Sequence, residues 1–511
     1  MKLATLLLAV ASLTTTSAYH ILCVQNVPSK SHYHLMKGLV DPLLEAGHQV
    51  TLITTFPGSK PVPNLTYIDV SHIQDLVKHI DMTHQQSQGL DIVKQFARNI
   101  SRSSLETPAV RDTLTRGQFD AVITEWFFSD MDAGYAAVLQ VPWIQLSGMV
   151  LHTHMEYLVD AVRSVPTIPA MVNDYDVPMT LWQRLMNSFA YLYFSYHTTW
   201  DQSSVQANYE QYFAPIAAAR GVALPEFTSA MRNISVLFVN SHPSFAPAMP
   251  VPPNVVDIAG YHIDEVVPPL PKDLKDLLDS SPQGVVYFSM GSVLKSAALP
   301  EQTRKDLVKM FSELPYTVLW KFEEKMEGLP KNLHIRPWMP QSSILSHPNV
   351  KVFITHGGLL STLESLQFGV PVIAVPVFGD QPSNARRSVR AGHALMVPFH
   401  PPDMAADLKV ALHETLSNSS YYKRAQQLSK LFRNRPVSNK KLIQHYVELA
   451  IETKGAYHLR SKSLLYSWYQ LWMLDQLAVL VLALLLIITL IKRGINRFTK
   501  KPVKGKKDKR N

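Results

Sequence analysis

The segment from Trp338 to Gln381 carries the side chains with the clearest potential for chemistry. Within it, His356, Gly357 and Gly358 follow the β-branched run from Val350 to Thr355 and precede residues that suit a helix. The run predicts a buried parallel strand. A strand, a glycine turn and a helix start together present free backbone N–H groups and the positive end of a helix dipole, which suits a diphosphate. By itself, a His-Gly-Gly turn is also compatible with an ordinary strand-to-helix connection.

This segment contains W-M-P-Q, H-G-G-L-L-S-T-L-E and G-D-Q-P, and with this spacing it resembles the signature of the UDP-glycosyltransferases. The resemblance extends through nearly the full chain. It implies that Trp338 stacks on uracil, Gln341 contacts the uracil and ribose side, His356, Gly358 and Ser361 hold the diphosphate, Glu364 holds the ribose hydroxyls, and Asp380 and Gln381 hold the sugar. Where many plant members have asparagine, this chain has Leu360, so one polar donor near the phosphate is missing.

A second glycine turn is predicted to face the same phosphates. The run G-V-V-Y-F-S-M-G-S predicts another strand that ends in a glycine turn, and by the resemblance Ser289, Gly291 and Ser292 contact the donor. Protein dipoles and side chains would then stabilise the leaving diphosphate. Because we identify no acidic D-x-D metal motif, we predict no metal site and no cofactor, with the UDP-sugar as a co-substrate.

A histidine loop follows the first predicted strand. Residues 20–25 and 49–55 predict strands and residues 33–46 a helix, the βαβ opening of a doubly wound sheet. Such sheets bind ligands in the loop after a strand, and here that loop contains His32. An imidazole titrates near neutral pH and can take the proton of an attacking hydroxyl. The resemblance implies that His32 is the catalytic base, with His34 as a competing candidate.

The resemblance also implies a carboxylate that orients the catalytic histidine. It lies at the end of a later strand, where F-D-A-V-I-T leads to Glu125 instead of the aspartate that is often found. Because glutamate is one methylene longer, Asp130 is an alternative partner. The two His-x-His pairs could instead bind a metal, but we predict none because no nearby cluster completes a ligand set.

The composition predicts a large two-domain protein that does not bind nucleic acid. A chain of 511 residues exceeds what one hydrophobic core usually supports. Residues 492–511 contain ten Lys or Arg and one Asp, which account for the whole net charge of +9. No basic groove is therefore implied for the rest of the chain. Cys23 is the only cysteine, lies in an apolar run and is predicted to be a small core residue.

Both ends of the chain carry targeting features. Residues 1–18 predict a secretory signal peptide. Residues 471–491 predict a transmembrane helix, and residues 492–511 a basic cytoplasmic tail. The ending Lys507-Asp508-Lys509-Arg510-Asn511 resembles a dilysine retrieval signal, so we expect an endoplasmic reticulum membrane protein with a lumenal body. Four sequons begin at Asn64, Asn99, Asn233 and Asn418.

We predict a GT-B α/β fold, in which two Rossmann-like domains face each other. Residues 19–240 would bind the acceptor, residues 241–280 would form a proline-rich linker, and residues 281–455 would bind the UDP-sugar. The aromatic, helical stretch 151–213 would form either the wall of an apolar acceptor pocket or a core or membrane-facing surface.

The predicted reaction transfers a hexose, glucose or else glucuronic acid, to a hydroxyl of a small lipophilic acceptor with inversion. A non-catalytic protein that binds UDP-sugar or lipophiles is the alternative. A dinucleotide-dependent oxidoreductase is disfavoured because no G-x-G-x-x-G follows the first strand. The oligomeric state is left open.

Overall fold

The computed structural model describes residues 18–77, 90–160, 164–170, 173, 175–292 and 294–499. The predicted signal peptide, apart from Ala18, and the dilysine-type ending lie outside the described residues. The chain divides into two compact units, residues 1–460 and residues 461–511. The first unit contains two parallel sheets, and the second contains a long apolar helix.

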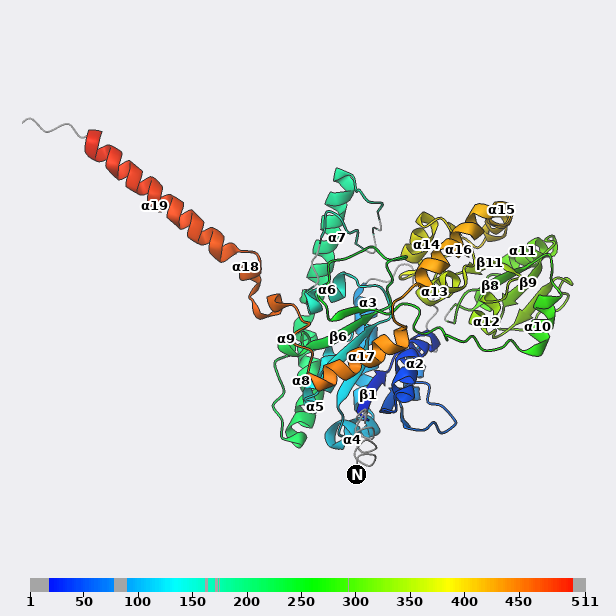
Figure 1. The fold of residues 1–511 in the computed structure, drawn as a ribbon, viewed down its shortest axis with the longest axis horizontal. Helices are drawn as coiled ribbons and strands as arrows, with labels where there is room; N and C mark the ends of the chain where they lie inside the picture. The colour runs from blue at the N-terminus through cyan, green and yellow to red at the C-terminus, as the bar shows by residue number, and fades with distance from the viewer. Residues whose placement is uncertain are drawn as a thin grey trace, which may run out of the picture. The chain divides into compact units, whose positions relative to one another are not determined.

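The first sheet has seven parallel strands in the order β3-β2-β1-β4-β5-β6-β7 (Figure 1). The strands are β1 (His20–Gln25), β2 (Gln49–Thr54), β3 (Leu65–Asp69), β4 (Ala121–Trp126), β5 (Trp143–Ser147), β6 (Ile234–Val239) and β7 (Val255–Asp257). The central strands are apolar and buried on both faces, as in sheets covered by helices on each side. The predicted βαβ opening is confirmed, and Cys23 is buried within β1.

Helices cover both faces of this sheet. One face packs against α2 (Lys30–Glu45) and α17 (Asn439–Glu452), which share a hydrophobic cluster with β1 and β6. The opposite face packs against α3 (Leu90–Glu106), α4 (Pro108–Arg116), α5 (Ala133–Leu139), α6 (Thr153–Val159), α8 (Gln202–Arg220) and α9 (Phe227–Ala230). The carboxyl ends of β1, β4 and β5 remain available for a site.

The second sheet has six parallel strands in the order β10-β9-β8-β11-β12-β13. They are β8 (Val285–Ser289), β9 (Thr317–Lys321), β10 (Leu333–Arg336), β11 (Val350–Thr355), β12 (Val372–Ala374) and β13 (Ala394–Met396). Helices α10 (Lys272–Asp279) and α12 (Gln341–Leu345) pack on one face, and α11 (Glu301–Ser312) and α15 (Met404–Ser417) on the other. The remaining helices of this half are α13 (Leu359–Phe368), α14 (Gln381–Arg390) and α16 (Ser419–Arg433).

Each sheet with the helices that pack on it forms one half of the first unit, called the first half and the second half below. The chain passes between these two halves more than once. The proline-rich stretch 241–280 contains β7, which pairs with β6, and α10, which packs on the second sheet. After α16 the chain returns to the first sheet, where Ile443 and Val447 of α17 join its core. The predicted second domain, residues 281–455, therefore includes a helix that belongs to the first half. The apolar side of α17 completes the hydrophobic cluster on the first sheet.

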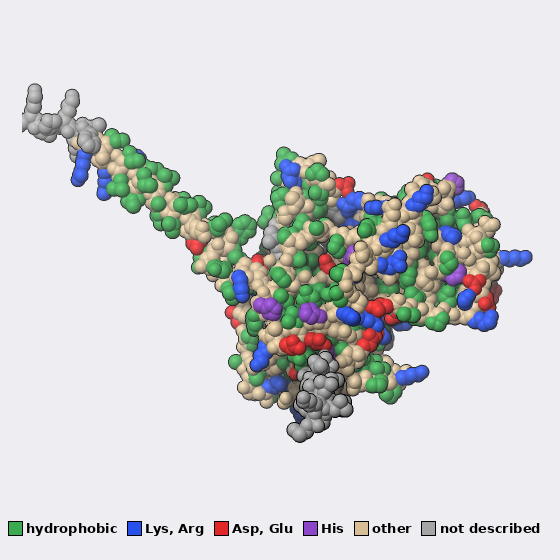
Figure 2. Space-filling model, in the orientation of Figure 1, with side chains coloured by type: hydrophobic (Ala, Val, Ile, Leu, Met, Phe, Trp, Pro, Cys, Tyr) green, Lys and Arg blue, Asp and Glu red, His purple; other side chains and the backbone are tan. Residues whose placement is uncertain are grey.

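The second unit contains α19 (Leu474–Thr499), whose side chains are mostly hydrophobic along its length (Figure 2). Its apolar part, Leu474–Arg497, spans 24 residues with a mean hydropathy of 2.7 and is unburied. That length is sufficient to cross a bilayer. The helix begins three residues later than predicted because Met473, with φ of 55°, separates it from α18 (Trp468–Leu471).

Candidate active site

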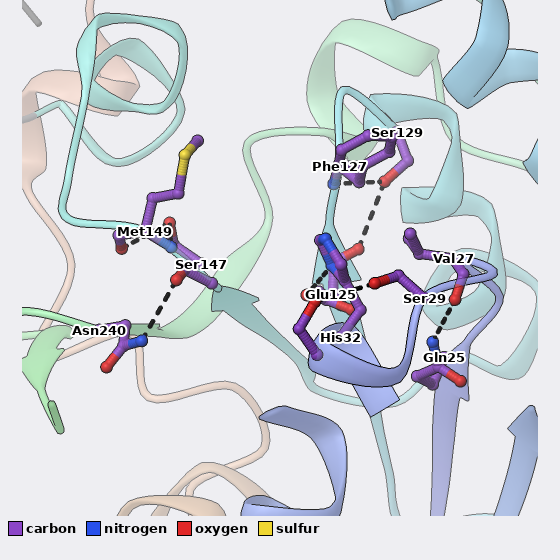
Figure 3. Close-up of polar contacts among 12 residues, drawn as sticks. Gln25, Val27, Ser29, His32, Glu125, Phe127, Ser129, Ser147, Met149 and Asn240 are labelled. Carbon is purple, nitrogen blue, oxygen red and sulfur yellow. Dashed lines mark hydrogen bonds and ion pairs between the residues drawn. The ribbon is translucent and has the colours of Figure 1, made fainter. Parts of the chain in front are cut away.

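The structure brings His32 and Glu125 into direct contact (Figure 3). His32 lies in the first turn of α2, which begins at Lys30, three residues earlier than predicted. Glu125 lies on β4, the neighbour of β1. The two side chains meet at the carboxyl edge of the sheet with a distance of 2.6 Å between His32 Nδ1 and Glu125 Oε1. A neutral His32 that donates its Nδ1–H to Glu125 keeps Nε2 free as a proton acceptor.

Of the two carboxylates considered from the sequence, Glu125 is the one that contacts His32. Asp130 instead accepts hydrogen bonds from Trp126 Nε1 at 2.8 Å and from the Tyr157 hydroxyl at 3.0 Å. Space for the longer glutamate comes from Gly148, where a Cβ would lie 3.2 Å from Glu125 Oε1 and 2.8 Å from a methyl group of Leu35. Gly148 has no side chain, and this leaves room for the extra methylene of Glu125.

The surroundings of His32 favour its protonated form. Burial lowers the pKa of His32, but the charge of Glu125, the hydrogen bond to Glu125 and the charge of Asp380 together raise it above its usual value. The Glu125 side chain is 1% exposed, whereas that of His32 is 26% exposed. His32 can therefore exchange a proton with a ligand, while Glu125 acts through His32.

A mainly apolar cavity begins at Val150, two residues after the Gly148 that lies against Glu125. It is lined by Val150, Ile168, Tyr191, Met249 and Val251 among others, and its charged or titratable members are His152, Glu156, Asp257 and Arg387. Two neighbouring aromatic residues at the end of β4 contact the base and a cavity residue respectively. The ring of Phe127 meets His32 edge-on at 5.4 Å between centroids, and that of Trp126 lies 4.9 Å from His152.

In the second half, the glycine turn after β11 encloses the ring of His356. A Cβ on Gly358 would lie 2.4 Å from His356 Nε2, and a Cβ on Gly291 would lie 2.5 Å from His356 Cε1. The imidazole is therefore held between two glycine backbones, one from each predicted phosphate turn. Gly357 has φ of +78°, which a residue with a side chain rarely adopts. These features support the predicted anion site at the start of α13.

The imidazole of His356 is kept neutral, and a buried lysine contributes to this. Burial, followed by the charge of Lys321, lowers the pKa of His356 to about 4. Lys321 ends β9, is 7% exposed and forms a 2.7 Å ion pair with Glu323. The sequence analysis did not select Lys321, although its place at the end of a strand beside β8 was a usable signal. A neutral imidazole and a nearby ammonium group are both suitable partners for a diphosphate.

Polar side chains join α12 to α13 at the predicted ribose site. Gln341 Nε2 donates to Glu364 and, at 3.0 Å, to Ser361 Oγ. The Ser342 hydroxyl donates to Glu364 at 2.5 Å. Burial raises the pKa of Glu364, while the bonds from Ser342 and Gln341 lower it. The structure thus brings Gln341, Ser361 and Glu364 together, although Ser361 was predicted at the diphosphate, and adds Ser342, which the sequence analysis missed.

The Glu364→Gln substitution is expected to weaken donor binding with little effect on kcat. Removing a hydrogen-bonded buried charge should raise KM and Kd for the UDP-sugar by about 10- to 100-fold. Because a ribose contact is the same in the ground and transition states, kcat should change little. Initial rates and UDP titrations would measure both, with Ser342→Ala as a milder control. An unchanged KM with a reduced kcat would contradict this role.

The predicted sugar residues are linked to the phosphate turn by Asn384. Asp380 caps α14 and accepts a hydrogen bond from Asn384 Nδ2 at 2.7 Å, while the same nitrogen donates to the Gly357 carbonyl at 3.2 Å. Gln381 is buried, and its Oε1 accepts bonds from the Val377 and Phe378 backbone at 2.8 and 3.1 Å. The sequence analysis missed Asn384 because its role depends on the first turn of α14, which places its side chain between Asp380 and the glycine turn after β11.

The other residues predicted to bind the donor differ in exposure. Trp338 is 54% exposed, and the Lys30 ammonium of the first half lies 5.3 Å from the centre of its ring. Ser289 is buried and its hydroxyl accepts from the Gly291 backbone at 3.3 Å, whereas Ser292 is exposed. Leu360 packs against the core of the first half. Leu360 therefore makes an apolar contact between the halves, at the position where many plant members have a polar asparagine.

The prediction of no metal rested on the absence of a D-x-D motif, and that basis was wrong, because Asp130 and Asp132 form such a pair. Within the described part of the chain, no group of three or more His, Cys, Asp or Glu side chains is arranged to hold a metal ion. The rings of His152 and His154 lie 5.7 Å apart and contact aromatic side chains.

Comparisons with known proteins show the family to which the chain belongs. The family model described as "UDP-glucoronosyl and UDP-glucosyl transferase" matches residues 24–510. UDP-glucosyltransferase 2 of Dactylopius coccus is 33% identical, with 94% of each chain covered. The human UDP-glucuronosyltransferase 2B7 is 25% identical, also with 94% of each chain covered.

The fold is shared with solved glycosyltransferases. The glycosyltransferase VinC, solved in complex with DTDP, superimposes with a TM-score of 0.54 at 17% identity, covering 85% of this chain and all of that one. The predicted GT-B architecture, with two Rossmann-like halves and an apolar C-terminal helix, is confirmed. The chain belongs to the UDP-glucuronosyl and UDP-glucosyl transferase family and is a UDP-glycosyltransferase.

Proposed function

We propose that this enzyme transfers glucose from UDP-glucose to a hydroxyl group of a small lipophilic acceptor, with inversion at the anomeric carbon and no further cofactor. The observation that carries the proposal is that Asp380 lies close enough to the His32–Glu125 pair for its charge to act on His32. The charge of Asp380 contributes to the raised pKa of His32. A base on the first half and a predicted sugar ligand on the second half therefore act within one site.

The proposed reaction begins when Nε2 of neutral His32 takes the proton of the acceptor hydroxyl. The acceptor oxygen forms a bond to the anomeric carbon as the bond to the UDP oxygen breaks on the opposite side, and UDP leaves with that electron pair. The imidazolium that forms is stabilised by Glu125 at 2.6 Å. Backbone N–H groups at the start of α13, with His356 and Lys321, offset the charge that develops on the diphosphate.

Two observations favour glucose over glucuronic acid as the transferred sugar. The relative at 33% identity is named a glucosyltransferase. The carboxylate of Asp380, in the predicted sugar site, would repel the carboxylate of a uronic acid. Glucuronic acid is the alternative, because the human relative is named a glucuronosyltransferase.

The acceptor class and the location follow from apolar features. The cavity that begins at Val150 is lined mainly by hydrophobic side chains, which suits a lipophilic ligand with a reactive hydroxyl. The apolar α19 would anchor the enzyme in a membrane, with the basic tail in the cytoplasm and the catalytic unit in the lumen of the endoplasmic reticulum.

The test is UDP release by membranes that contain the full chain, with UDP-glucose and UDP-glucuronic acid, over a panel of phenolic acceptors. His32→Ala should lower kcat/KM by roughly 10²- to 10⁴-fold, the usual contribution of a general base. UDP should bind this variant as tightly as the parent, because the direct contacts of His32 are with Glu125 and Phe127 of the first half. If UDP binds but neither protein shows acceptor-dependent release with either donor, a non-catalytic UDP-sugar or lipophile carrier becomes the better description.

A further inference from the structure

A buried histidine, His152, lies in the wall of the cavity that begins at Val150. The wall is otherwise formed mainly by hydrophobic side chains, which include Ile168, Met249 and Tyr191 of α7 (Leu181–Trp200). The aromatic, helical stretch 151–213 therefore contributes to the wall of an apolar cavity, one of the roles considered from the sequence. A polar ring in such a wall can determine which ligands the cavity accepts.

The imidazole of His152 is neutral and has hydrogen-bonding capacity to spare. His152 is 4% exposed, and neither ring nitrogen has a hydrogen-bond partner among the described residues. It is the N-cap residue of α6, but its side chain makes no capping hydrogen bond. Burial, followed by the charge of His154, lowers the pKa of His152 to about 3. At physiological pH one ring nitrogen is therefore a donor and the other an acceptor.

Two sets of contacts relate the cavity to the reaction centre. On the first half, Val150 follows Gly148, which lies against Glu125. On the second half, Arg387 lines the cavity and lies two helical turns after Asp380, whose charge acts on His32. Two turns of helix correspond to about 10 Å. An acceptor that fills the cavity while its hydroxyl reaches the base is therefore elongated, with a far end on the order of 10 Å from the reacting oxygen.

The charged side chains of the wall indicate that this far end is uncharged. The carboxylates of Glu156 and Asp257 outnumber the guanidinium group of Arg387. Arg387 also lies over the ring of Phe245, at 6.0 Å from its centre. A carboxylate or phosphate on the ligand would meet a wall of net negative charge, whereas a hydroxyl, ether or carbonyl group would not be repelled.

We propose that His152 is a specificity-determining residue, whose imidazole hydrogen bonds to a second, uncharged polar group at the end of the acceptor remote from the reacting hydroxyl. The preferred acceptors are then elongated neutral lipophiles with a hydrogen-bonding group at each end. This inference rests on the proposed transfer to a lipophilic hydroxyl. A ligand that lacks the second group leaves the buried ring nitrogens unpaired, which is unfavourable.

The test compares two acceptors that differ only in the remote group. In 4-hydroxy-4′-methoxybiphenyl an ether oxygen lies at the end remote from the phenol, and in 4-ethyl-4′-hydroxybiphenyl a methylene group replaces that oxygen. Equilibrium dialysis of the full chain with UDP, in one detergent, gives Kd for each acceptor, and initial rates with UDP-glucose give kcat and KM. The variants are His152→Phe and, as a control, His154→Phe, the same change at a buried histidine that is not a lining residue.

In His152→Phe, the affinity for the methoxy compound relative to the ethyl compound should fall roughly 5- to 100-fold. His154→Phe should keep the ratio of the parent, and His152→Gln, which retains a donor and an acceptor, should restore part of it. KM should follow Kd with little change in kcat, because the contact is remote from the reacting atoms. An unchanged ratio in a His152→Phe variant that retains parental thermal stability and UDP affinity would overturn the proposal.

A third ligand tests the proposal on the parent chain alone, so the result does not depend on the folding of any variant. The compound 4′-hydroxybiphenyl-4-carboxylate should bind the parent more weakly than the methoxy compound, and tighter binding would overturn the assignment of a neutral far end. Dialysis requires no turnover. If the parent transfers neither sugar, the proposed function fails, while the Kd ratios still decide the role of His152.

Discussion

Glu125→Gln should reduce kcat/KM and shift its acid limb to lower pH. In the parent enzyme, the interactions with Glu125 and Asp380 outweigh burial and hold the pKa of His32 above its usual value near 6.5. A base must be neutral to act, so activity should rise with pH through that raised pKa. The substituted amide keeps a hydrogen-bond acceptor but removes the charge, and burial then lowers the pKa of His32. The lost stabilisation of the imidazolium should reduce kcat/KM about 100-fold near neutral pH.

The measurement is kcat/KM between pH 5 and 9 for the parent, Glu125→Gln and Glu125→Asp. Aspartate keeps the charge but is one methylene shorter, so it breaks the 2.6 Å contact in a site whose space is set by Gly148. Its rate should fall while its acid limb stays closer to that of the parent. An acid limb that stays in place in Glu125→Gln would show that this limb does not report His32.

The parts of the fold set by local pattern were predictable from the sequence. The run from Val350 to Thr355 forms β11 with the predicted bounds, because β-branched residues bordered by proline and glycine leave little choice of structure. The first strand also has the predicted bounds. The glycine turn after β11 follows from residue type, since Gly357 has a positive φ.

Contacts between distant parts of the sequence could not be predicted in this way. The return of α17 to the first sheet depends on matching apolar surfaces that are hundreds of residues apart. The choice of Glu125 over Asp130 depends on the space left by Gly148, which no local pattern shows. Lys321 and Asn384 are ordinary residues in the sequence, and their positions beside the phosphate turn depend on the packing of β9 and α14.

The His356 ring relates the two glycine turns in a way that spacing alone does not show. From the sequence, Gly291 and Gly358 each permit a close approach of backbone to phosphate. In the structure, each also leaves room for the same imidazole. The ring cannot move away from one turn without approaching the other, so a change in either turn affects both.

Gly358→Ala should therefore abolish most donor binding. Its Cβ would lie 2.4 Å from His356 Nε2 and 2.9 Å from Cε1, so the ring or the turn must move. Overpacking of this kind costs roughly 1–3 kcal/mol, which corresponds to about a 5- to 150-fold increase in Kd for UDP if the folded site bears the strain. Because the same turn stabilises the leaving diphosphate, kcat should fall as well. UDP titration and initial rates would measure the two effects.

Two further glycines separate the contact with His356 from backbone strain. Gly291→Ala combines a Cβ 2.5 Å from His356 Cε1 with φ of +82°, whereas Gly328→Ala has a similar φ of +69° and nothing within 4 Å of its Cβ. Both should lose some thermal stability, because each forces alanine into a left-handed conformation. Only Gly291→Ala should also lose UDP affinity. Equal UDP affinity in Gly358→Ala and Gly328→Ala would contradict the view that the confined His356 ring organises the diphosphate site.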